Sequence, residues 1–262
     1  MLLTVDLSNT YITLGCVEDG IVRFSCRMAA DKTRTEDEYA VFIRLMISSR
    51  GADLDAVEGS ILSSVVPELT LPLRRALMNI TGQKPMVVGP GVKTGLNIRL
   101  DDPSELGSDF VAAAVAAQAA MELPIALVTM DTAMGIGVID TAGAYIGGVI
   151  APGVMVSSAA LTRRASLLPN VIPRAPGHII CRKTDESLRS GLIYGAAAML
   201  DGLLTGIDEE LGHSVNVVAT GIWASAVVPH CRRKGIEIDP DLIHKGLWLI
   251  WKKNQRREQP QA

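Results

Sequence analysis

Two aspartates stand at matching places in two similar stretches of the sequence. Asp6 ends an apolar run at the start of the chain, and Asp131 ends another, 125 residues later. After each come a short loop, a second apolar run, a turn containing glycine and a third run, which predicts strand, hairpin, strand, turn and strand. A carboxylate at a strand end can position a metal ion or its water, while hairpin amides and hydroxyls can bind phosphate. Either aspartate could instead be an ordinary hairpin residue that accepts hydrogen bonds from turn amides.

The repeated layout predicts two halves built on one plan, with a cleft between them. We place the first half at residues 1–118 and the second at 119–262. Turn, cap and periodicity signals predict the elements around these stretches. Expected helices cover 36–49, capped by Thr35, then 69–79, 110–121, 154–167, 185–210, capped by Thr184, and 240–251. Expected strands cover 57–66, 85–88 and 215–219.

A third carboxylate, Asp109, follows Gly107 and Ser108 at the predicted start of an Ala-rich helix that begins near Phe110. An aspartate at this place commonly caps the helix. The alternative is a general base, because a carboxylate that lines a closed site can accept the proton of a hydroxyl that attacks a phosphoryl group. The sequence pattern leaves both roles open.

Composition limits the classes of function. Of 262 residues, 48% are hydrophobic and 20% charged, with a formal net charge of −3, so no basic surface argues for nucleic acid or a membrane. The four cysteines have no CxxC spacing, which predicts reduced thiols. The most apolar stretch, 111–130, is interrupted by Gln118, Glu122 and Pro124 and reads as a buried helix and a strand. With no secretory leader at the start, we expect a cytoplasmic protein.

Motifs along almost the whole chain are similar to those of type III pantothenate kinases. Their order and spacing make the resemblance specific. The shared motifs are Asp6-Leu-Ser-Asn9-Thr10, Ser63-Ser64-Val-Val-Pro67, Gly91-Val-Lys-Thr-Gly-Leu96, Leu106-Gly-Ser-Asp109, Gly147-Gly-Val-Ile-Ala-Pro-Gly153, Lys183-Thr184, Ser190-Gly191, Tyr194-Gly195, Asp201-Gly202, Ala219-Thr-Gly221 and Asp239-Pro-Asp-Leu242.

The resemblance implies an α/β chain with the acetate and sugar kinase/Hsp70/actin fold, in which two ribonuclease H-like halves enclose an ATP cleft. It implies a homodimer that phosphorylates pantothenate with ATP, the first step to coenzyme A, with Mg²⁺ and a monovalent cation, K⁺ or NH₄⁺. By the same resemblance Asp109 is the catalytic base, Asp6 serves Mg²⁺, Asp131 touches K⁺, and Thr184 binds pantothenate across the dimer interface. The remaining implied contacts are Ser8, Asn9, Thr10, Thr132, Gly135 and Gly221 for ATP and its phosphates, and Gly107, Ser108 and Phe110 for the substrate.

Several positions depart from the family pattern. Phe110 replaces an arginine that would pair with the pantothenate carboxylate, and losing one partner of such a pair costs roughly 2–5 kcal/mol. Met134 replaces a threonine of the second phosphate loop. Further replacements are Ser8 for glycine, Leu100 for tyrosine, Ile136 and Gly137 for hydroxyl residues, and Ile222 for glycine.

Three hypotheses follow from these departures. The chain is an active pantothenate kinase with an altered site, or a catalytically impaired paralogue. Such a paralogue would act as the non-catalytic partner in a heterodimer, offering its Thr184 face to an active relative. The third hypothesis is a kinase or binding protein for another small molecule, because Phe110 and Leu100 make the acceptor pocket more apolar.

Overall fold

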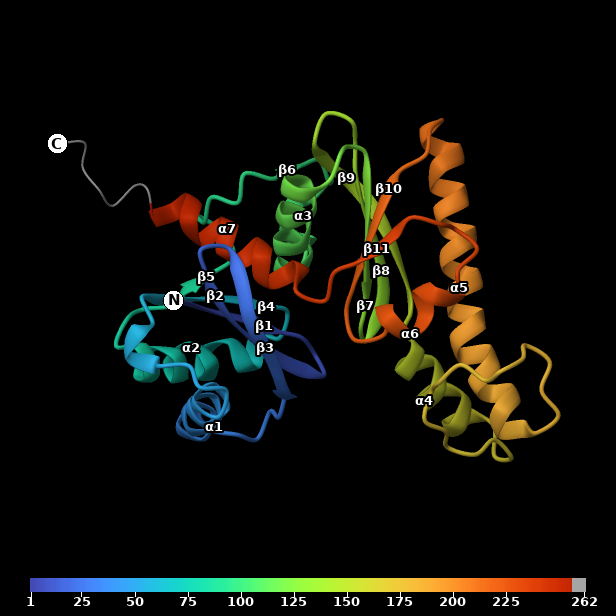
Figure 1. Cartoon of the computed structure of the whole chain (residues 1–262), viewed down its shortest axis with the longest axis horizontal. Helices are drawn as coiled ribbons and strands as arrows, with labels where there is room; N and C mark the ends of the chain where they lie inside the picture. Colours follow the sequence, from blue (N-terminus) through green and yellow to red (C-terminus); the bar gives the residue numbers. More distant parts are fainter. Residues whose placement is uncertain (256–262) are drawn as a thin grey trace. The chain divides into compact units, whose positions relative to one another are not determined.

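A computed structural model describes residues 1–255, which form two compact units (Figure 1). Unit 1 contains Met1–Leu96, Asp101–Ala119 and the described residues from Asp241 onward. Unit 2 contains Asn97–Leu100 and Ala120–Pro240. The expected division at 118/119 assigned the last helix to the second half, whereas its contacts assign it to unit 1.

Unit 1 is built on a five-stranded mixed sheet of order β3-β2-β1-β4-β5. Its strands are β1 Leu2–Leu7, β2 Tyr11–Glu18, β3 Ile21–Ala29, β4 Gly59–Ser64 and β5 Met86–Val87. The first three strands run antiparallel to one another, and β4 and β5 run parallel to β1. All six residues of β1 are buried, so both faces of this central strand must be covered.

Helices cover the two faces of the unit 1 sheet. The helices are α1 Glu36–Ser48, α2 Pro67–Thr81, α3 Ser108–Ala120 and α7 Leu242–Gln255, with short 3-10 turns at Leu54–Ala56 and Pro103–Glu105. α1 and α2 close an apolar core over one face. α7 contacts β1, β2 and β4, and it also approaches α3, since a side chain at Gly246 would collide with the backbone of Ala112.

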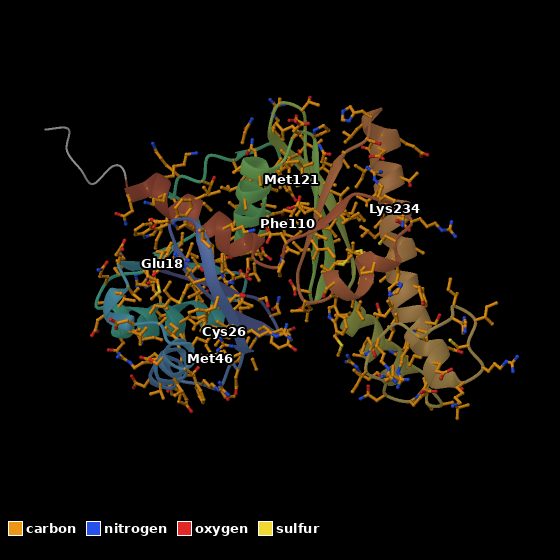
Figure 2. The ribbon with its side chains drawn as sticks, viewed as in Figure 1. Glu18, Cys26, Met46, Phe110, Met121 and Lys234 are labelled. Carbon is orange, nitrogen blue, oxygen red and sulfur yellow. The ribbon has the colours of Figure 1, made fainter. Side chains whose placement is uncertain are left out.

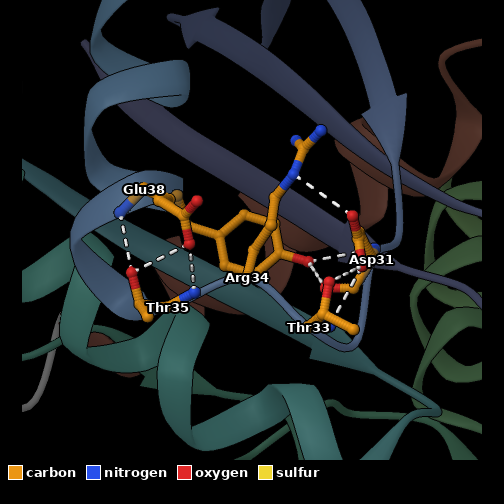
Figure 3. A network of polar contacts seen from close by, with 6 residues as sticks. Asp31, Thr33, Arg34, Thr35 and Glu38 are labelled. Atoms are coloured by element: carbon orange, nitrogen blue, oxygen red, sulfur yellow. Dashed lines mark hydrogen bonds and ion pairs between the residues drawn. The ribbon is translucent and has the colours of Figure 1, made fainter.

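The start of α1 is capped by Thr35, as the sequence predicted, and the cap is part of a reciprocal capping box with Glu38 (Figure 3). The Glu38 amide donates to the Thr35 hydroxyl at 3.3 Å, and the Thr35 amide donates to Glu38 Oε2 at 2.8 Å. Tyr39 is buried behind this cap, and its hydroxyl donates to the carbonyl of Asp31 at 2.6 Å. The cap therefore joins the β3–α1 connection to the core.

Unit 2 repeats the strand order of unit 1 and adds one edge strand. Its strands are β6 Asn97–Ile98, β7 Ile125–Met130, β8 Ala133–Ile139, β9 Ala144–Pro152, β10 Asn216–Thr220 and β11 Ile236–Ile238. They lie in the order β11-β10-β7-β8-β9-β6. If the strands of each unit are numbered in chain order and β6 is left out, both sheets have the order 3-2-1-4-5 and the same strand directions. The repeat inferred from Asp6 and Asp131 is thus a repeat of topology.

The helices of unit 2 are α4 Val154–Arg164, α5 Thr184–Leu211 and α6 Ala224–Val227, followed by a 3-10 turn at Val228–His230. Within the described residues α5 is the one helix long and apolar enough to cross a membrane by length and composition. One of its faces, which includes Ile193, Ala197 and Leu200, lies in the apolar core with β7 and β10. We therefore describe α5 as a core helix.

A buried hydrogen-bonded triad attaches α7 to the centre of the unit 1 sheet. The Thr4 hydroxyl donates to the carbonyl of Gly15 at 2.9 Å, so it accepts a hydrogen bond from Nδ1 of His244 at 2.8 Å. A side chain at Gly15 would overlap both partners, so the sheet needs glycine there. Burial lowers the pKa of His244 to about 4, partly opposed by Asp241, and the imidazole is neutral in the folded protein.

This burial predicts a loss of stability in acid. His244 binds a proton near pH 6.5 in the unfolded chain but only near pH 4 in the folded one. The contribution of His244 to the free energy of unfolding is therefore fully present above pH 6.5. The free energy of unfolding falls by about 3 kcal/mol in total as the pH drops to 4. Urea unfolding at several pH values measures this slope. We expect His244→Gln to flatten it and the exposed His213→Gln to leave it unchanged; equal slopes in all three proteins would contradict the assignment.

Candidate active site

Asp6 lies on the face of β1 opposite the α1–α2 core. Leu3, Val5 and Leu7 enter that core, and the alternation of a strand therefore turns Thr4 and Asp6 toward the face covered by α7. Asp6 is 6% exposed and is paired in register with Thr13 of β2 and Ser63 of β4. A nearly buried carboxylate is thus placed near the carboxyl end of a central strand.

Ser108 joins the start of α3 to the end of β4. Its hydroxyl donates to the Ser64 carbonyl at 3.1 Å, accepts from the Ser64 amide at 2.8 Å, and lies 3.0 Å from the Ser63 hydroxyl. Because its own proton goes to the carbonyl, Ser108 accepts the Ser63 proton. Ser108 was predicted as a substrate contact, and its hydroxyl is engaged in positioning α3. Asp6, Ser63 and the first turn of α3 are thereby brought together.

Asp109 bends back over the first turn of α3, where the helix dipole favours a negative charge. Its Oδ1 accepts a hydrogen bond from the Phe110 amide at 2.9 Å. The same oxygen lies where a side chain on Gly107 would begin, so a Cβ there would overlap it. Phe110 lies on the same turn of α3 (Figure 2) and is half-buried. Its side chain carries no positive charge that could pair with an anionic substrate. The turn thus holds a carboxylate beside a mostly apolar surface.

The first hairpin uses Ser8 to close itself. The Ser8 amide and hydroxyl both donate to the Tyr11 carbonyl, at 2.9 and 3.0 Å, and the Tyr11 amide lies 3.2 Å from the hydroxyl. Ser8 has no left-handed backbone angle, so serine is accommodated without strain where the family pattern has glycine. Asn9 and Thr10 form the exposed tip of the hairpin. Of the three predicted phosphate contacts in this loop, Asn9 and Thr10 are exposed at the tip, whereas the Ser8 hydroxyl forms hydrogen bonds inside the loop.

In unit 2, Asp131 connects the second hairpin to the turn after β10. Its Oδ1 accepts from the Ile222 amide at 3.0 Å, and the Trp223 amide donates to the Met130 carbonyl at 3.0 Å. Asp131 stands directly after β7, whereas Asp6 lies inside β1, so the second hairpin is the tighter of the two. Asp131, which the resemblance predicts to bind potassium, therefore accepts a hydrogen bond that holds the turn after β10.

Two glycines allow backbones to approach closely around Asp131. Gly221 has φ +96°, and a Cβ there would lie 2.6 Å from the Met130 carbonyl oxygen. A side chain at Gly153 would collide with the carbonyl oxygens of Asp131 and Thr132. These contacts put Gly221, Thr132 and Asp131 into one compact group of backbone amides and carbonyls.

Met134 lines a small pocket together with Asp131, Gly153 and Trp223. It is 2% exposed and packs in the unit 2 core with Met130, Ile136 and Val154. Gly135 follows it on the opposite face of β8, in register with Thr129 of β7. The methionine at this place of the phosphate loop is thus a core residue.

Thr184 is the first residue of α5 and is exposed. The prediction that it caps the helix was wrong, because the N-cap is Lys183 and no side chain caps this end. Within the described residues the Thr184 hydroxyl is assigned no hydrogen bond. Its hydroxyl is therefore accessible, and its predicted contact with pantothenate stays a prediction.

No group of three or more His, Cys, Asp or Glu side chains in residues 1–255 could hold a metal alone. Mg²⁺ in phosphoryl transfer sites needs only one or two carboxylates, because substrate phosphates and water complete its shell. The nearly buried carboxylate of Asp6 meets that requirement. The carbonyl oxygens of Asp131 and Thr132 lie against Gly153, and carbonyl oxygens are the ligand type that suits K⁺.

Some residues of these clusters were not predicted as site residues. Ser63 and Ser64 hold α3 through Ser108, and Gly153 and Trp223 pack around Asp131. The available signal was two serines at the end of a buried strand, with Pro67 three residues after the second. Nothing in the sequence indicated that they face the start of a helix 44 residues later.

The comparison with known proteins decides the family. The family model described as "Type III pantothenate kinase" matches residues 2–206. A type III pantothenate kinase of Exiguobacterium sibiricum is 36% identical over 255 residues, covering 97% of this chain and 100% of the relative. The corresponding protein of Brevibacillus brevis is 37% identical with the same coverage. This chain belongs to the type III pantothenate kinase family.

Solved structures agree on the fold of this family member. A putative Baf family transcriptional activator of Campylobacter jejuni has a TM-score of 0.62 at 16% identity and covers 97% of this chain and 99% of its own. Component A of (R)-2-hydroxyglutaryl-CoA dehydratase of Acidaminococcus fermentans has a TM-score of 0.55 at 13% identity, covering 97% and 98%. The fold is that of the sugar kinase, actin and Hsp70 superfamily, as the sequence predicted.

The contact between Gly107 and Asp109 predicts that Gly107→Ala impairs catalysis more than stability. A methyl group there must displace the Asp109 carboxylate. If Asp109 is the base that the family resemblance implies, a shift of about 1 Å at this group costs on the order of 10²-fold in rate. Kinase assays and thermal melting separate the two effects. Gly89→Ala is the matched control, because nothing lies within 4 Å of its Cβ position. Unchanged kcat in Gly107→Ala would show that the carboxylate position does not matter.

Proposed function

We propose that this chain catalyses transfer of the γ-phosphoryl group of ATP to the hydroxyl of pantothenate, the first step to coenzyme A, with Asp109 as the general base. Family membership over nearly the full length supports the reaction. The observation that carries the proposal for Asp109 is its bent position over Gly107 at the N-terminus of α3. The other hypotheses, an impaired paralogue and a different acceptor, receive no support from the family matches.

In this proposal Asp109 accepts the proton of the substrate hydroxyl as its oxygen attacks the γ-phosphorus and ADP leaves. Asp6 would hold Mg²⁺, which when bound neutralises charge on the phosphates. The hairpin tip at Asn9 and Thr10 offers backbone amides and side chains to phosphate. Ser108 positions α3 and hence Asp109, without a proton-transfer role of its own.

Unit 2 would hold the nucleotide side of the reaction. Gly221, Thr132 and Gly135 are the proposed contacts of ATP, and Asp131 the proposed contact of K⁺ or NH₄⁺. The close packing of Gly221 on Met130 supports this assignment, because only glycine lets the turn after β10 approach the end of β7 so closely. Gly107 and Phe110 would contact pantothenate, with Phe110 against an apolar part of the substrate.

We further propose that the chain forms a dimer through α5 and the loop before it. The outward face of α5 is lined by Gly191, Gly195, Gly202 and Gly206, and a Cβ on any of them would meet nothing within 4 Å. Each glycine costs about 1 kcal/mol relative to alanine in a helix, so four on one face favour close packing against another helix. Exposed apolar side chains lie in the preceding loop: Leu167 at 94%, Ile172 at 80% and Ile180 at 89%.

Thr184 begins the same helix, so a dimer on this surface would place it at the interface, in keeping with its proposed contact with pantothenate. The partner is a second copy or a related chain. The cytoplasm is the proposed location, since all four cysteines are free thiols.

Removal of the proposed base gives the direct test. Asp109→Asn keeps the shape and the acceptor oxygen but loses the base, and we expect kcat to fall by about 10²–10⁴-fold with ATP binding retained. Asp101→Asn, an exposed aspartate before the same helix, is the control and should keep wild-type kcat. Activity retained in Asp109→Asn would refute the role of this residue, and a wild-type chain without turnover would revive the impaired paralogue.

The dimer proposal is tested by Gly195→Arg. Space beside Gly195 is open within one chain, so the protomer should fold normally while the added side chain blocks close helix packing. Light scattering should show a dimer for the wild type and for Ser48→Arg on α1, and a monomer for Gly195→Arg. A dimer that persists in Gly195→Arg would place the interface elsewhere.

A further inference from the structure

Arg27 belongs to a row of polar residues that crosses the unit 1 sheet. Asp6 of β1 is in register with Thr13 of β2, and Thr13 is in register with Arg27 of β3. On the other side of β1, Ser63 of β4 is in register with Asp6. Residues paired in register point to the same face of a sheet, so these four side chains share the face opposite the α1–α2 core. Cys26, the neighbour of Arg27, lies in that core, as the alternation of a strand requires.

The guanidinium group of Arg27 is held beside the first hairpin. Its central carbon lies 5.2 Å from the centre of the Tyr11 ring, within the distance of a cation–π contact. Tyr11 directly follows Asn9 and Thr10, the exposed tip of the hairpin. Its carbonyl also accepts the two hydrogen bonds from Ser8 that close the hairpin. The contact therefore places a positive charge next to the amides and side chains that the tip offers to phosphate.

Arg27 has no acidic partner among residues 1–255, whereas the neighbouring cations do. Arg23 of the same strand pairs with Glu18, with 2.9 Å between Nε and Oε2. Lys32 and Arg34, which follow β3, also form ion pairs. The exposed side chain of Arg27 makes only its contact with the tyrosine ring in the described part of the chain, so the guanidinium donors are available to an anion. Guanidinium groups match phosphate because their planar donors bond two oxygens at once.

We propose that Arg27 binds the terminal phosphates of ATP. The proposal rests on the kinase function proposed above and adds a residue to it. Neighbouring strands lie about 4.8 Å apart, so about 10 Å separates the backbones of Asp6 and Arg27 across β2. A triphosphate with its Mg²⁺ can occupy this span between the two side chains. The row of Asp6, Thr13 and Arg27 then offers one place for the metal and one for the phosphate charge, beside the hairpin tip.

Nucleotide titrations of Arg27→Gln in the full-length chain test the proposal. We expect Mg·ATP to bind about tenfold more weakly, the effect of losing one charge-assisted hydrogen bond. AMP lacks the two terminal phosphates, and its affinity should change by less than about twofold, because screening weakens the effect of a more distant charge. Arg27→Lys keeps the charge but loses the fork of donors, so its affinity for ATP should lie between those of the wild type and Arg27→Gln.

The matched control is Arg23→Gln, which removes an exposed arginine from the same strand, already paired with Glu18. It should change the affinity for either nucleotide by less than about twofold. Equal ATP affinity in the wild type and Arg27→Gln would overturn the proposal and leave the kinase function standing. So would equal weakening of ATP and AMP, which would indicate a disturbed site in place of a lost phosphate contact. A wild-type chain that binds neither nucleotide would overturn both this proposal and the function on which it rests.

Discussion

The burial of β1 on both faces is the constraint on which unit 1 depends. Every residue of this strand is covered, with Leu3, Val5 and Leu7 on the α1–α2 side and Leu2, Thr4 and Asp6 on the other. Polar groups inside a protein must be bonded, and Thr4 achieves this with Gly15 and His244. The same face carries Asp6. The burial that stabilises the sheet therefore also places bonded polar side chains along one face of its central strand. The candidate site lies at the end of that strand, where Asp6 stands.

Close backbone approach is the second principle of the candidate site. At Gly107 the absence of a side chain gives the Asp109 carboxylate its place, and at Gly221 and Gly153 it lets loops from three strands share one small volume. The hydroxyl groups mainly form local hydrogen bonds: that of Ser8 closes its hairpin, and that of Ser108 connects α3 to β4. The departures from the family pattern become understandable in these terms. Ser8 fits because its backbone is not left-handed, and Met134 fits because that side of β8 faces the core.

The sequence predicted the architecture well because the architecture follows from local signals. Apolar alternation, turn glycines and the Thr35 cap identified the repeated strands and α1 correctly. The family motifs then implied the superfamily fold. The sequence could not show that α7 belongs with the first strands, since that depends on contacts between distant residues, such as His244 with Thr4, which lie 240 positions apart. It also misjudged Thr184, because capping depends on a single backbone angle, and it gave no sign that Arg27 and Asp6 lie on one face of the sheet.

The return of α7 to unit 1 has a consequence for how the protein is made. Strands β1 to β5 leave the ribosome first, yet the helix that covers the polar face of β1 is translated only after all of unit 2. Until then Thr4 has no histidine partner and part of the sheet stays uncovered. Unit 2, whose segment Ala120–Pro240 is continuous, can finish folding earlier. The unit synthesised first is thus completed last, and nascent chains released early would carry an open sheet face, a natural target for chaperones and proteases.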